Sequence, residues 1–385
     1  MNTRSKHLIT CLAAVALVAS CGGDDDDASV ATDAPPTTDA PDPTDAPDPT
    51  AAPETTDAPE TTDAPETTDA PETTDAPETT DAPEEMTAAT AGLSILAPAP
   101  ALELAANGFK DSAAECATVE IEIIERNAEG DIPALTSIIE GFLGDDVDLI
   151  ATVTTPAAQA AFQVVGAAGG TTPVVYSVVT DPFAAGLATD PSTHEPWITG
   201  SQSLPPFAEV VDAAVQIVPD LQVMGVVYNP SESNAQTVVD ALQAIADERG
   251  LTLELVTIAD SSEVGQATEA LLGRDVDAFI VPTDTTMVSG MAAMVQIAGD
   301  NDIPVIGTDA NHAETGAAIG LGTDYYGSGV RAGEIACAVL SGEATPADFD
   351  VEPVESLGIA VNPEAAEAQG VTIPDELLAQ AETAG

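Results

Sequence analysis

The chain has 385 residues, which is enough for a long tail and two domains of ordinary size. Seven Lys and Arg stand against 66 Asp and Glu, so the formal net charge is −59. This balance argues against a nucleic-acid partner, because phosphate binding needs clustered Lys and Arg. Residues 86–385 carry 45 acids against five bases, which predicts an acidic surface suited to high ionic strength.

Residues 1–20 predict a secretory leader, with Arg4 and Lys6 ahead of an apolar run from Leu8 to Val18. Small residues then precede Cys21, and the run Leu17 to Gly22 resembles a bacterial lipobox. A cysteine in that position is acylated and becomes the mature N-terminus. We therefore expect Cys21 to anchor the chain to the outer face of the cell membrane, with no spanning helix. A soluble secreted protein cut nearby is the alternative.

Residues 21–91 form an acidic linker of low complexity, rich in Thr, Asp, Ala, Pro and Glu. Five identical Thr-Thr-Asp-Ala-Pro-Glu units run from Thr55 to Glu84. The units contain no apolar residue larger than Ala or Pro, so they cannot bury a core. The sequence therefore predicts a disordered N-terminal stalk.

From residue 92 the expected strands and helices alternate. In the first half we expect strands at 93–96, 119–124, 147–153 and 173–179, and helices at 102–116, 131–143 and from 155 onward. A Pro-, Gly- and Ser-rich loop at 190–206 interrupts the pattern. It then restarts with helices at 207–218, 233–249, from 261, and 287–301, and strands at 222–228, 251–258, 276–281 and 304–307. This repetition predicts an α/β protein with two parallel-sheet lobes.

The segment from Asp146 to Ala160 is the clearest candidate for a binding site. Its first half predicts a buried strand, which Thr154 and Thr155 follow directly. Thr155 suits the N-cap of a helix, and Pro156 suits the first helical position. A helix start with two hydroxyls favours a carboxylate or phosphate, because backbone N–H groups and the helix dipole point at it. An ordinary capped helix is the alternative.

The other strands also end in polar side chains. In open parallel sheets, ligands bind outside the carboxyl ends of the strands. We therefore expect one cleft between the lobes, lined by Thr154, Thr155, Thr180, Asp181, Asn229, Ser233, Asn234, Thr283, Asp284 and Asp309.

Sequence motifs of the common enzyme classes are missing. No Gly-x-Ser-x-Gly, His-Glu-x-x-His or Gly-x-x-x-x-Gly-Lys segment occurs, so nucleophile, zinc and nucleotide chemistry lack their usual parts. His194 and His312 have no metal-ligand partner at helical spacing, and 166–170 suits a helix end better than a phosphate loop. We expect no catalysis, no metal and no cofactor.

Several segments together resemble the ABC-transporter substrate-binding lipoproteins that include tryptophan- and tyrosine-binding members. The resemblance runs from about Leu93 to Ala381. Its segments are Asn127-Ala128-Glu129-Gly130-Asp131, Asp148-Leu149-Ile150, Thr155-Pro156-Ala157-Ala158-Gln159-Ala160, Val179-Thr180-Asp181-Pro182, Gly225-Val226-Val227-Tyr228-Asn229-Pro230, Pro282-Thr283-Asp284 and Asp324-Tyr325-Tyr326.

The resemblance implies a type I periplasmic-binding fold, with two doubly wound lobes joined by a hinge of three crossovers. The implied first lobe is 92–204 plus 308–342, and the second is 205–307 plus 343–376. It also implies a monomer that captures an amino acid or similar small solute, with an ABC permease and its ATPase as partners. A ligand-sensing or adhesive surface lipoprotein without a transport role is the alternative.

An amino-acid ligand implies roles for the predicted site residues, since its carboxylate and ammonium need opposite partners once desolvated. We expect Thr154 and Thr155, joined by Ser233 and Asn234, to hold the carboxylate. One of three aspartates (Asp181, Asp284 and Asp309, with Asp309 first) would hold the ammonium, and at least one of them would only cap a turn. The family usually carries a His-Pro-type loop after the first strand, but here Ala97–Ala101 offers no side-chain hydrogen bond.

Two cysteines, Cys116 and Cys337, lie beyond the leader. By the family topology the helix Gly329–Leu340 returns to the first lobe, so we expect the two to pair. Two buried free thiols are the alternative.

Overall fold

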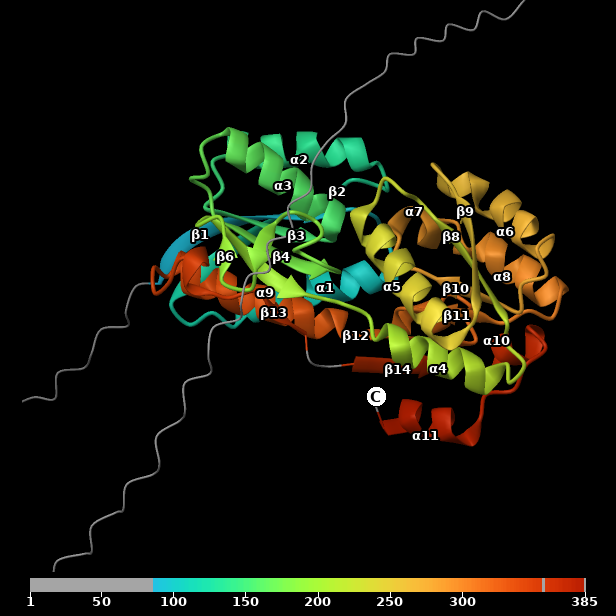
Figure 1. The fold of residues 1–385 in the computed structure, drawn as a ribbon. Coiled ribbons are helices and arrows are strands. Elements are labelled where there is room, and N and C mark those ends of the chain that lie inside the picture. Colours follow the sequence, from blue (N-terminus) through green and yellow to red (C-terminus); the bar gives the residue numbers. More distant parts are fainter. Residues whose placement is uncertain (1–85, 355–356, 384–385) are drawn as a thin grey trace, which may run out of the picture. The chain divides into compact units, whose positions relative to one another are not determined.

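The computed structural model describes residues 86–354 and 357–383. The expected leader, the Cys21 anchor and the stalk up to residue 85 lie outside the described residues. Two six-stranded sheets organise the described part of the chain (Figure 1). In these residues no helix combines the length and apolarity that a membrane crossing requires.

The first sheet has the strand order β13-β7-β4-β3-β1-β2, and all its pairings are parallel. Its strands are β1 (Thr87–Ile95), β2 (Val119–Asn127), β3 (Leu149–Val153), β4 (Val174–Val179), β7 (Ile198–Gln202) and β13 (Glu352–Pro353). The helices on it are α1 (Pro100–Ala114), α2 (Ile132–Gly144), α3 (Thr155–Ala167) and α9 (Tyr325–Leu340). A hairpin of β5 (Ala188–Asp190) and β6 (Thr193–His194) and a short helix η3 (Pro346–Asp348) complete this lobe.

The second sheet has the order β14-β12-β11-β10-β8-β9, parallel except for the β12–β14 pair. Its strands are β8 (Val223–Tyr228), β9 (Thr252–Thr257), β10 (Ala278–Val281), β11 (Val305–Gly307), β12 (Ile319–Thr323) and β14 (Leu357–Val361). Its helices are α4 (Phe207–Ile217), α5 (Ser233–Arg249), η1 (Ser261–Glu263), α6 (Val264–Leu272), α7 (Thr285–Ser289), α8 (Met291–Asp300), η2 (Ala310–Ala313), α10 (Pro363–Ala368) and α11 (Asp375–Thr383).

Helices cover both faces of each sheet, which produces four apolar clusters (Figure 1). In the first lobe α1 and α9 pack on one face, and α2 and α3 on the other. In the second lobe α4 and α5 pack on one face, and α6 and α8 on the other. Every residue of β3 and β4 is buried, as central strands covered on both sides require. The predicted α/β class with two doubly wound sheets is confirmed.

The chain passes from one sheet to the other three times. The passages run from β7 to α4, from β12 to α9, and from β13 to β14 through residues 355–356, which lie outside the described residues. Three crossovers were expected. The passage from β7 to α4 falls at residues 203–206, around the predicted boundary at 204/205, but the other two lie elsewhere than the predicted boundaries at 307/308 and 342/343. Residues 308–323 belong to the second lobe because β12 pairs with β11 and β14, and 343–354 belong to the first because β13 pairs with β7.

Three element boundaries also differ from the expected ones. β1 begins at Thr87, so residues 87–91 pair with β2 and are not linker. The expected helix at 287–301 is broken at Gly290, where a Cβ would collide with the Ser261 carbonyl and the Val264 side chain. The N-cap of α3 is Thr154 and not Thr155. Small residues at the start of β1 and alternating glycines in β12 are weak strand signals. The sequence pattern therefore predicted neither the first residues of β1 nor the strand β12.

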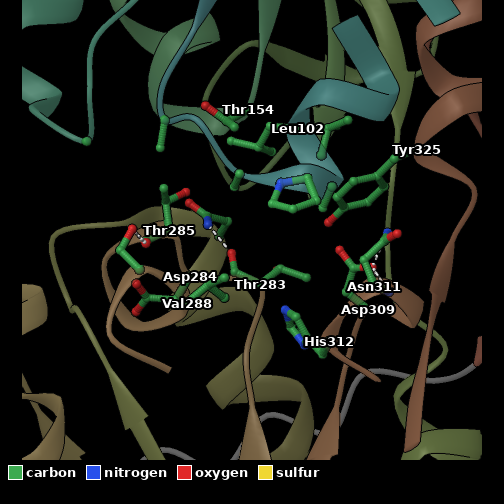
Figure 2. A pocket seen from close by; sticks show the side chains of 18 of the residues that line it. Leu102, Thr154, Thr283, Asp284, Thr285, Val288, Asp309, Asn311, His312 and Tyr325 are labelled. Atoms are coloured by element: carbon green, nitrogen blue, oxygen red, sulfur yellow. Dashed lines mark hydrogen bonds between the residues drawn. The ribbon is translucent and has the colours of Figure 1, made fainter. Parts of the chain in front are cut away.

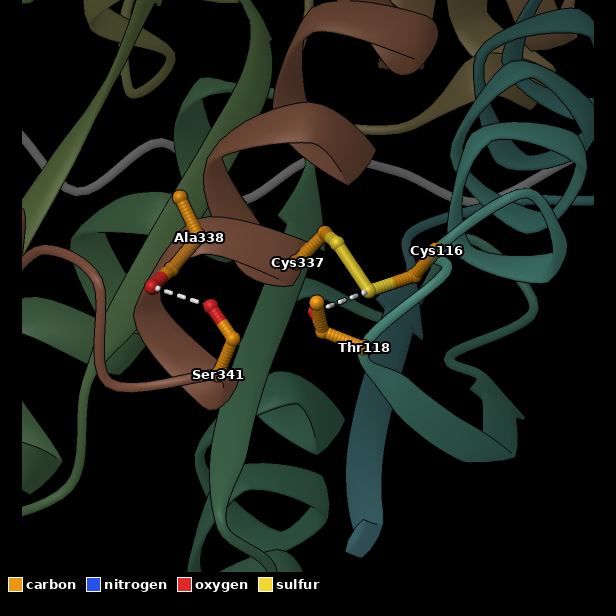
Figure 3. Close-up of a disulfide and its surroundings, with 5 residues drawn as sticks. All are labelled: Cys116, Thr118, Cys337, Ala338 and Ser341. Carbon is orange, nitrogen blue, oxygen red and sulfur yellow. Dashed lines mark hydrogen bonds between the residues drawn. A yellow bond between two sulfur atoms is a disulfide. The ribbon is translucent and has the colours of Figure 1, made fainter. Parts of the chain in front are cut away.

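A disulfide joins Cys116, just after α1, to Cys337 on α9 (Figure 3). The two helices pack closely along their length, because glycines of α9 face the backbone of α1. A Cβ at Gly329 would overlap the Ala105 carbonyl, and one at Gly333 would lie against Ser112. α1 and α9 therefore form a tightly fixed pair in the first lobe.

Candidate functional site

A cavity of about 440 Å³ lies at the carboxyl ends of the strands, and residues of both lobes line it (Figure 2). Its size is within the range of small-molecule sites, about 300–1,000 Å³. The cavity therefore occupies the position that the strand-end rule predicts for α/β sheets.

Two threonines at the start of α3 form the polar part of the first lobe's wall. Thr154 has φ 98° and ψ 155°, a conformation that is essentially limited to glycine and costs about 1–3 kcal/mol. Its Oγ1 accepts the N–H of Ala157 at 3.5 Å, and the Oγ1 of Thr155 accepts the N–H of Thr180 at 3.4 Å. A hydroxyl that accepts in this way keeps its own proton to donate. Both threonines line the cavity and have a donor left for an anionic group.

A second strained residue, Val178, lines the cavity from the neighbouring strand β4. Its φ is 55°, a left-handed value that is rare for a β-branched residue. The pairing of β4 with β7 shifts register between Tyr176 and Val179, so Val178 lies in a β-bulge. Strained backbone at two adjacent strand ends marks this wall as a functional surface.

The first lobe's wall also has an apolar part, beside the exposed carboxylate of Glu129. The segment from Ala97 to Leu102, which connects β1 to α1, borders the cavity with alanine, proline and leucine side chains. Val288 of α7 adds an apolar contact from the second lobe. The loop that lacked hydrogen-bonding side chains therefore supplies a hydrophobic surface for the ligand.

Asp309 dominates the second lobe's wall. It is only 3% exposed and caps η2, with its Oδ1 accepting the backbone N–H and the Nδ2 of Asn311, each at 2.8 Å. The hydroxyl of Tyr325 points toward it (Figure 2). Burial raises the pKa of Tyr325 well above its usual value, and the charge of Asp309 adds to this effect. Tyr325 therefore stays a neutral donor.

His312 lies next to Asp309 in the same wall. Burial lowers the pKa of this imidazole below its usual 6.5, although the charge of Asp309 acts in the opposite direction. Its Nδ1 is buried and has no hydrogen-bond partner in the described part of the chain. The unpaired Nδ1 lies close to Gly307 of β11, and the uncharged ring borders the cavity.

Asn234 lines the cavity at the start of α5. Its Nδ2 donates to the carbonyl of Thr283, which can only accept, so the amide orientation is fixed. The remaining Oδ1 is buried and unpaired within the described residues, and it suits a donor such as an ammonium. Ser233, expected beside it, does not line the cavity.

Asp284 and Glu232 form a buried pair of acids below the second wall. Asp284 caps α7 by accepting the N–H of Met287 at 2.8 Å, and it also accepts the N–H of Asn229. Glu232 accepts the N–H groups of Thr285 and Thr286, each at 3.0 Å. Burial, followed by the charge of Glu232, raises the pKa of Asp284 well above its usual value. Both oxygens of Asp284 accept backbone N–H groups, so this carboxylate supports the start of α7.

The two walls also touch each other. The Oγ1 of Thr180, after β4, lies 3.2 Å from the Oγ1 of Thr283, after β10. This contact joins the lobes at the edge of the cavity.

Seven of the ten predicted ligand residues line the cavity: Thr154, Thr155, Thr180, Asn234, Thr283, Asp284 and Asp309. The other three have local roles. Asp181 caps a turn by accepting the N–H groups of Phe183 and Ala184, Asn229 orders the loop before α5, and Ser233 is half-buried and does not line the cavity. Sequence reasoning missed Val178, Asn311, His312 and Tyr325. Asn311 and His312 follow β11 closely. They would have been predicted if the strand-end rule had been applied to the residues after Asp309 as well.

None of the described residues that line the cavity is Lys or Arg. The five basic residues of the described chain pair with carboxylates at the surface: Lys110, Arg126, Arg249, Arg274 and Arg331. The buried charge of Asp309 therefore has no cationic side chain as a partner in the cavity.

Residues 92–384 match the ABC transporter substrate binding protein family. The chain belongs to this family. Its members are solute-binding proteins and not enzymes; they bind small molecules outside the cytoplasm and work with ABC transporter components. The predicted family is thereby confirmed.

Three relatives show how close the similarity is. A tyrosine-binding protein of Clostridioides difficile (strain R20291) is 32% identical over 274 residues, covering 70% of this chain and 78% of that protein. The ABC domain from Streptococcus pneumonia in complex with L-Trp is 27% identical, with a TM-score of 0.71 over 76% of this chain and 98% of that one. The ligand-free, open structure of a substrate binding protein with adhesive properties from Clostridium difficile is 31% identical, with a TM-score of 0.57 over 74% and 96%.

Proposed function

We propose that this substrate-binding protein is lipid-anchored, serves an ABC importer and captures a free α-amino acid, with aromatic side chains preferred. The observation that carries the proposal is Asp309, a buried carboxylate that faces the cavity without a cationic side chain. An unpaired buried charge is costly, so the site favours a ligand that brings an ammonium. The unpaired Oδ1 of Asn234 is a second acceptor for the same group.

The carboxylate end of the ligand is assigned to the first lobe. Thr154 and Thr155 offer hydroxyl protons at the N-terminus of α3, where the helix dipole favours negative charge. Neutral donors satisfy one carboxylate, but a second acidic group on the ligand would lack a basic partner. The proposed ligand therefore has an uncharged side chain.

An aromatic side chain fits the remaining lining. The Ala97–Leu102 segment, Val178 and Val288 form an apolar surface, and burying aromatic area against it favours binding at about 25 cal/mol per Å². The relatives described above bind tyrosine or carry L-Trp by their names. The structure also superposes better on the L-Trp complex than on the open, ligand-free relative, which favours a closed cavity sized for such a ligand.

Calorimetry of ligand-free protein against the twenty amino acids tests this proposal. We expect saturable binding of L-tryptophan or L-tyrosine and no heat with aspartate or glutamate, which bring an extra negative charge. The protein is first unfolded, dialysed and refolded, because this treatment removes any copurified ligand. No heat with any amino acid would contradict the assignment.

The lipid anchor is tested separately, because Cys21 lies outside the described residues. Cys21→Ser should move the protein from the membrane fraction to the soluble fraction, since acyl chains would be the only membrane contact proposed. A mutant that stays with membranes after a salt wash would place the anchor elsewhere.

Adhesion is a second candidate, because one relative is described as a substrate binding protein with adhesive properties. A strain that lacks the protein should lose amino-acid uptake under the first proposal and surface attachment under the second. Loss of attachment with unchanged uptake would favour the adhesive function.

A further inference from the structure

The backbone of Val178 adopts a conformation that its own side chain disfavours. Its φ of 55° lies in the left-handed region, which a side chain with a Cβ disfavours and glycine adopts readily. Because the bulge breaks the ladder with β7, the N–H of Val178 has no strand partner. Something outside the sheet has to hold this residue in place.

Ser328 of α9 supplies the missing contact. Its Oγ accepts the N–H of Val178 at 3.1 Å, and the serine is fully buried. Two further buried hydroxyls surround it: Ser201 Oγ lies at 3.0 Å and Ser203 Oγ at 3.5 Å, both from the β7 side. Ser328 itself does not line the cavity.

The support behind Ser328 is rigid. Gly329, the next residue, packs against the Ala105 carbonyl of α1 so closely that no side chain fits between them. The other end of α9 is tied to α1 by the Cys116–Cys337 disulfide. α9 also presents Tyr325 to the cavity one turn earlier. The same helix therefore supports the bulge of β4 and places the Tyr325 side chain in the cavity lining.

Displacement of Val178 would affect the cavity directly. Its side chain is part of the apolar lining, and Thr180, two residues on, both lines the cavity and contacts Thr283 of the other lobe. We propose that Ser328 is a positioning residue of the ligand site: its buried hydroxyl holds the bulge of β4 so that Val178 and Thr180 face the ligand. The ligand part of this inference rests on the proposed amino-acid function.

Hydrogen exchange of the Val178 amide, followed by NMR in the ligand-free full chain, tests the contact without any ligand. Ser328→Ala should speed this exchange by about tenfold or more, because the N–H loses its buried acceptor. Ser201→Ala is the matched control: this residue is also buried and its hydroxyl contacts Ser328, but the N–H of Val178 donates to Ser328 and not to Ser201, so exchange should change by less than about threefold. Unchanged exchange in Ser328→Ala, or an equal effect of both variants, would overturn the proposal.

Binding of L-tryptophan measures the consequence for the site. We expect Ser328→Ala to weaken it about tenfold and Ser201→Ala to leave it within about twofold, because only the first variant releases the bulge. In a Val178→Gly background, glycine adopts the left-handed conformation unaided, so Ser328→Ala should add no more than about twofold. An undiminished effect in that background would contradict positioning through Val178. If the unaltered protein binds no amino acid, the proposed ligand is wrong, and exchange at Val178 still decides the role of Ser328.

Discussion

The two walls of the cavity use different chemistry. The first lobe contributes neutral hydroxyls, a helix start and apolar side chains, with strained backbone at Thr154 and Val178, and its one lining carboxylate, Glu129, is exposed. The second lobe contributes buried acids and amides, with Asp309 facing the cavity and Asp284 paired with Glu232 behind it. The first wall donates hydrogen bonds and the second accepts them, so the cavity is polarised.

This difference explains how a chain with so few basic residues would bind the proposed zwitterionic ligand. Placing all buried negative charge on one wall leaves the other free to receive a carboxylate through neutral donors. The ligand would then lie with its ammonium toward the second lobe and its carboxylate toward the first. Changes in one wall should therefore affect one end of the ligand.

The largest expected effect concerns the rigidity of the first lobe. Cys116→Ser with Cys337→Ser should lower the free energy of unfolding by about 5 kcal/mol in the chain-entropy model, since the bridge closes a loop of 221 residues. Urea unfolding measures this, and an early transition confined to the first lobe would show that the lobes differ in stability. Two reactive thiols in the unfolded, unreduced protein would exclude the bridge.

Asp309→Ala should have the largest effect on binding. Loss of the carboxylate leaves the ligand's ammonium buried without its partner, so binding should weaken by about 2–4 kcal/mol while the fold persists. Asp181→Ala is the control, because this aspartate only caps a turn and should leave calorimetric affinity unchanged. Equal losses in the two variants would remove the special role of Asp309.

Local sequence patterns predicted most of the fold and of the polar lining. Thr155, Thr283 and Asp309 each follow a short apolar run, and the carboxyl end of a parallel strand places such residues at one edge of the sheet. The lobe boundaries were less accessible, since β12 alternates glycine with apolar residues, and its partners lie far away in the chain. A local sequence pattern does not show which distant segments pair as strands.

Other site features depend on contacts between distant residues. Val178 lies in a continuous apolar strand, and only the hydroxyl of Ser328, 150 residues away, accounts for its turn toward the cavity. Tyr325 reaches the site because α9 begins at a crossover between the lobes. The orientation of the Asn234 amide could not be predicted either, because the Thr283 carbonyl that fixes it belongs to another strand end.

A smaller effect is expected on the first wall. Thr155→Val keeps the shape of the side chain but removes one donor to the ligand, so affinity should fall by about 1 kcal/mol. Thr152→Val is the matched control, since this buried hydroxyl on the preceding strand has no partner in the described chain and does not line the cavity. Calorimetry of both variants with L-tryptophan should separate them. Equal losses would contradict a specific role for Thr155.

The smallest effect is a pH dependence that belongs to the second lobe. Because the folded protein raises the pKa of Asp284 above 3.8, it binds this proton more tightly than the unfolded chain does. The contribution of this group to the free energy of unfolding is therefore fully present below pH 3.8. It is lost as the pH rises through the raised pKa of the folded protein. Asp284→Asn should flatten this fall in the urea midpoint between pH 4 and neutrality. An unchanged slope would place the dependence elsewhere.

The polarity of the cavity is tested most directly by calorimetry with L-tryptophan and indole-3-propionate, which lacks only the amino group. The unaltered protein should prefer L-tryptophan, and Asp309→Asn should abolish most of this preference, because the amino group loses its charged partner. Thr155→Val should weaken both ligands equally, since both keep the carboxylate. A preference that survives in Asp309→Asn, or that disappears in Thr155→Val, would contradict the assignment of the ammonium to the second lobe.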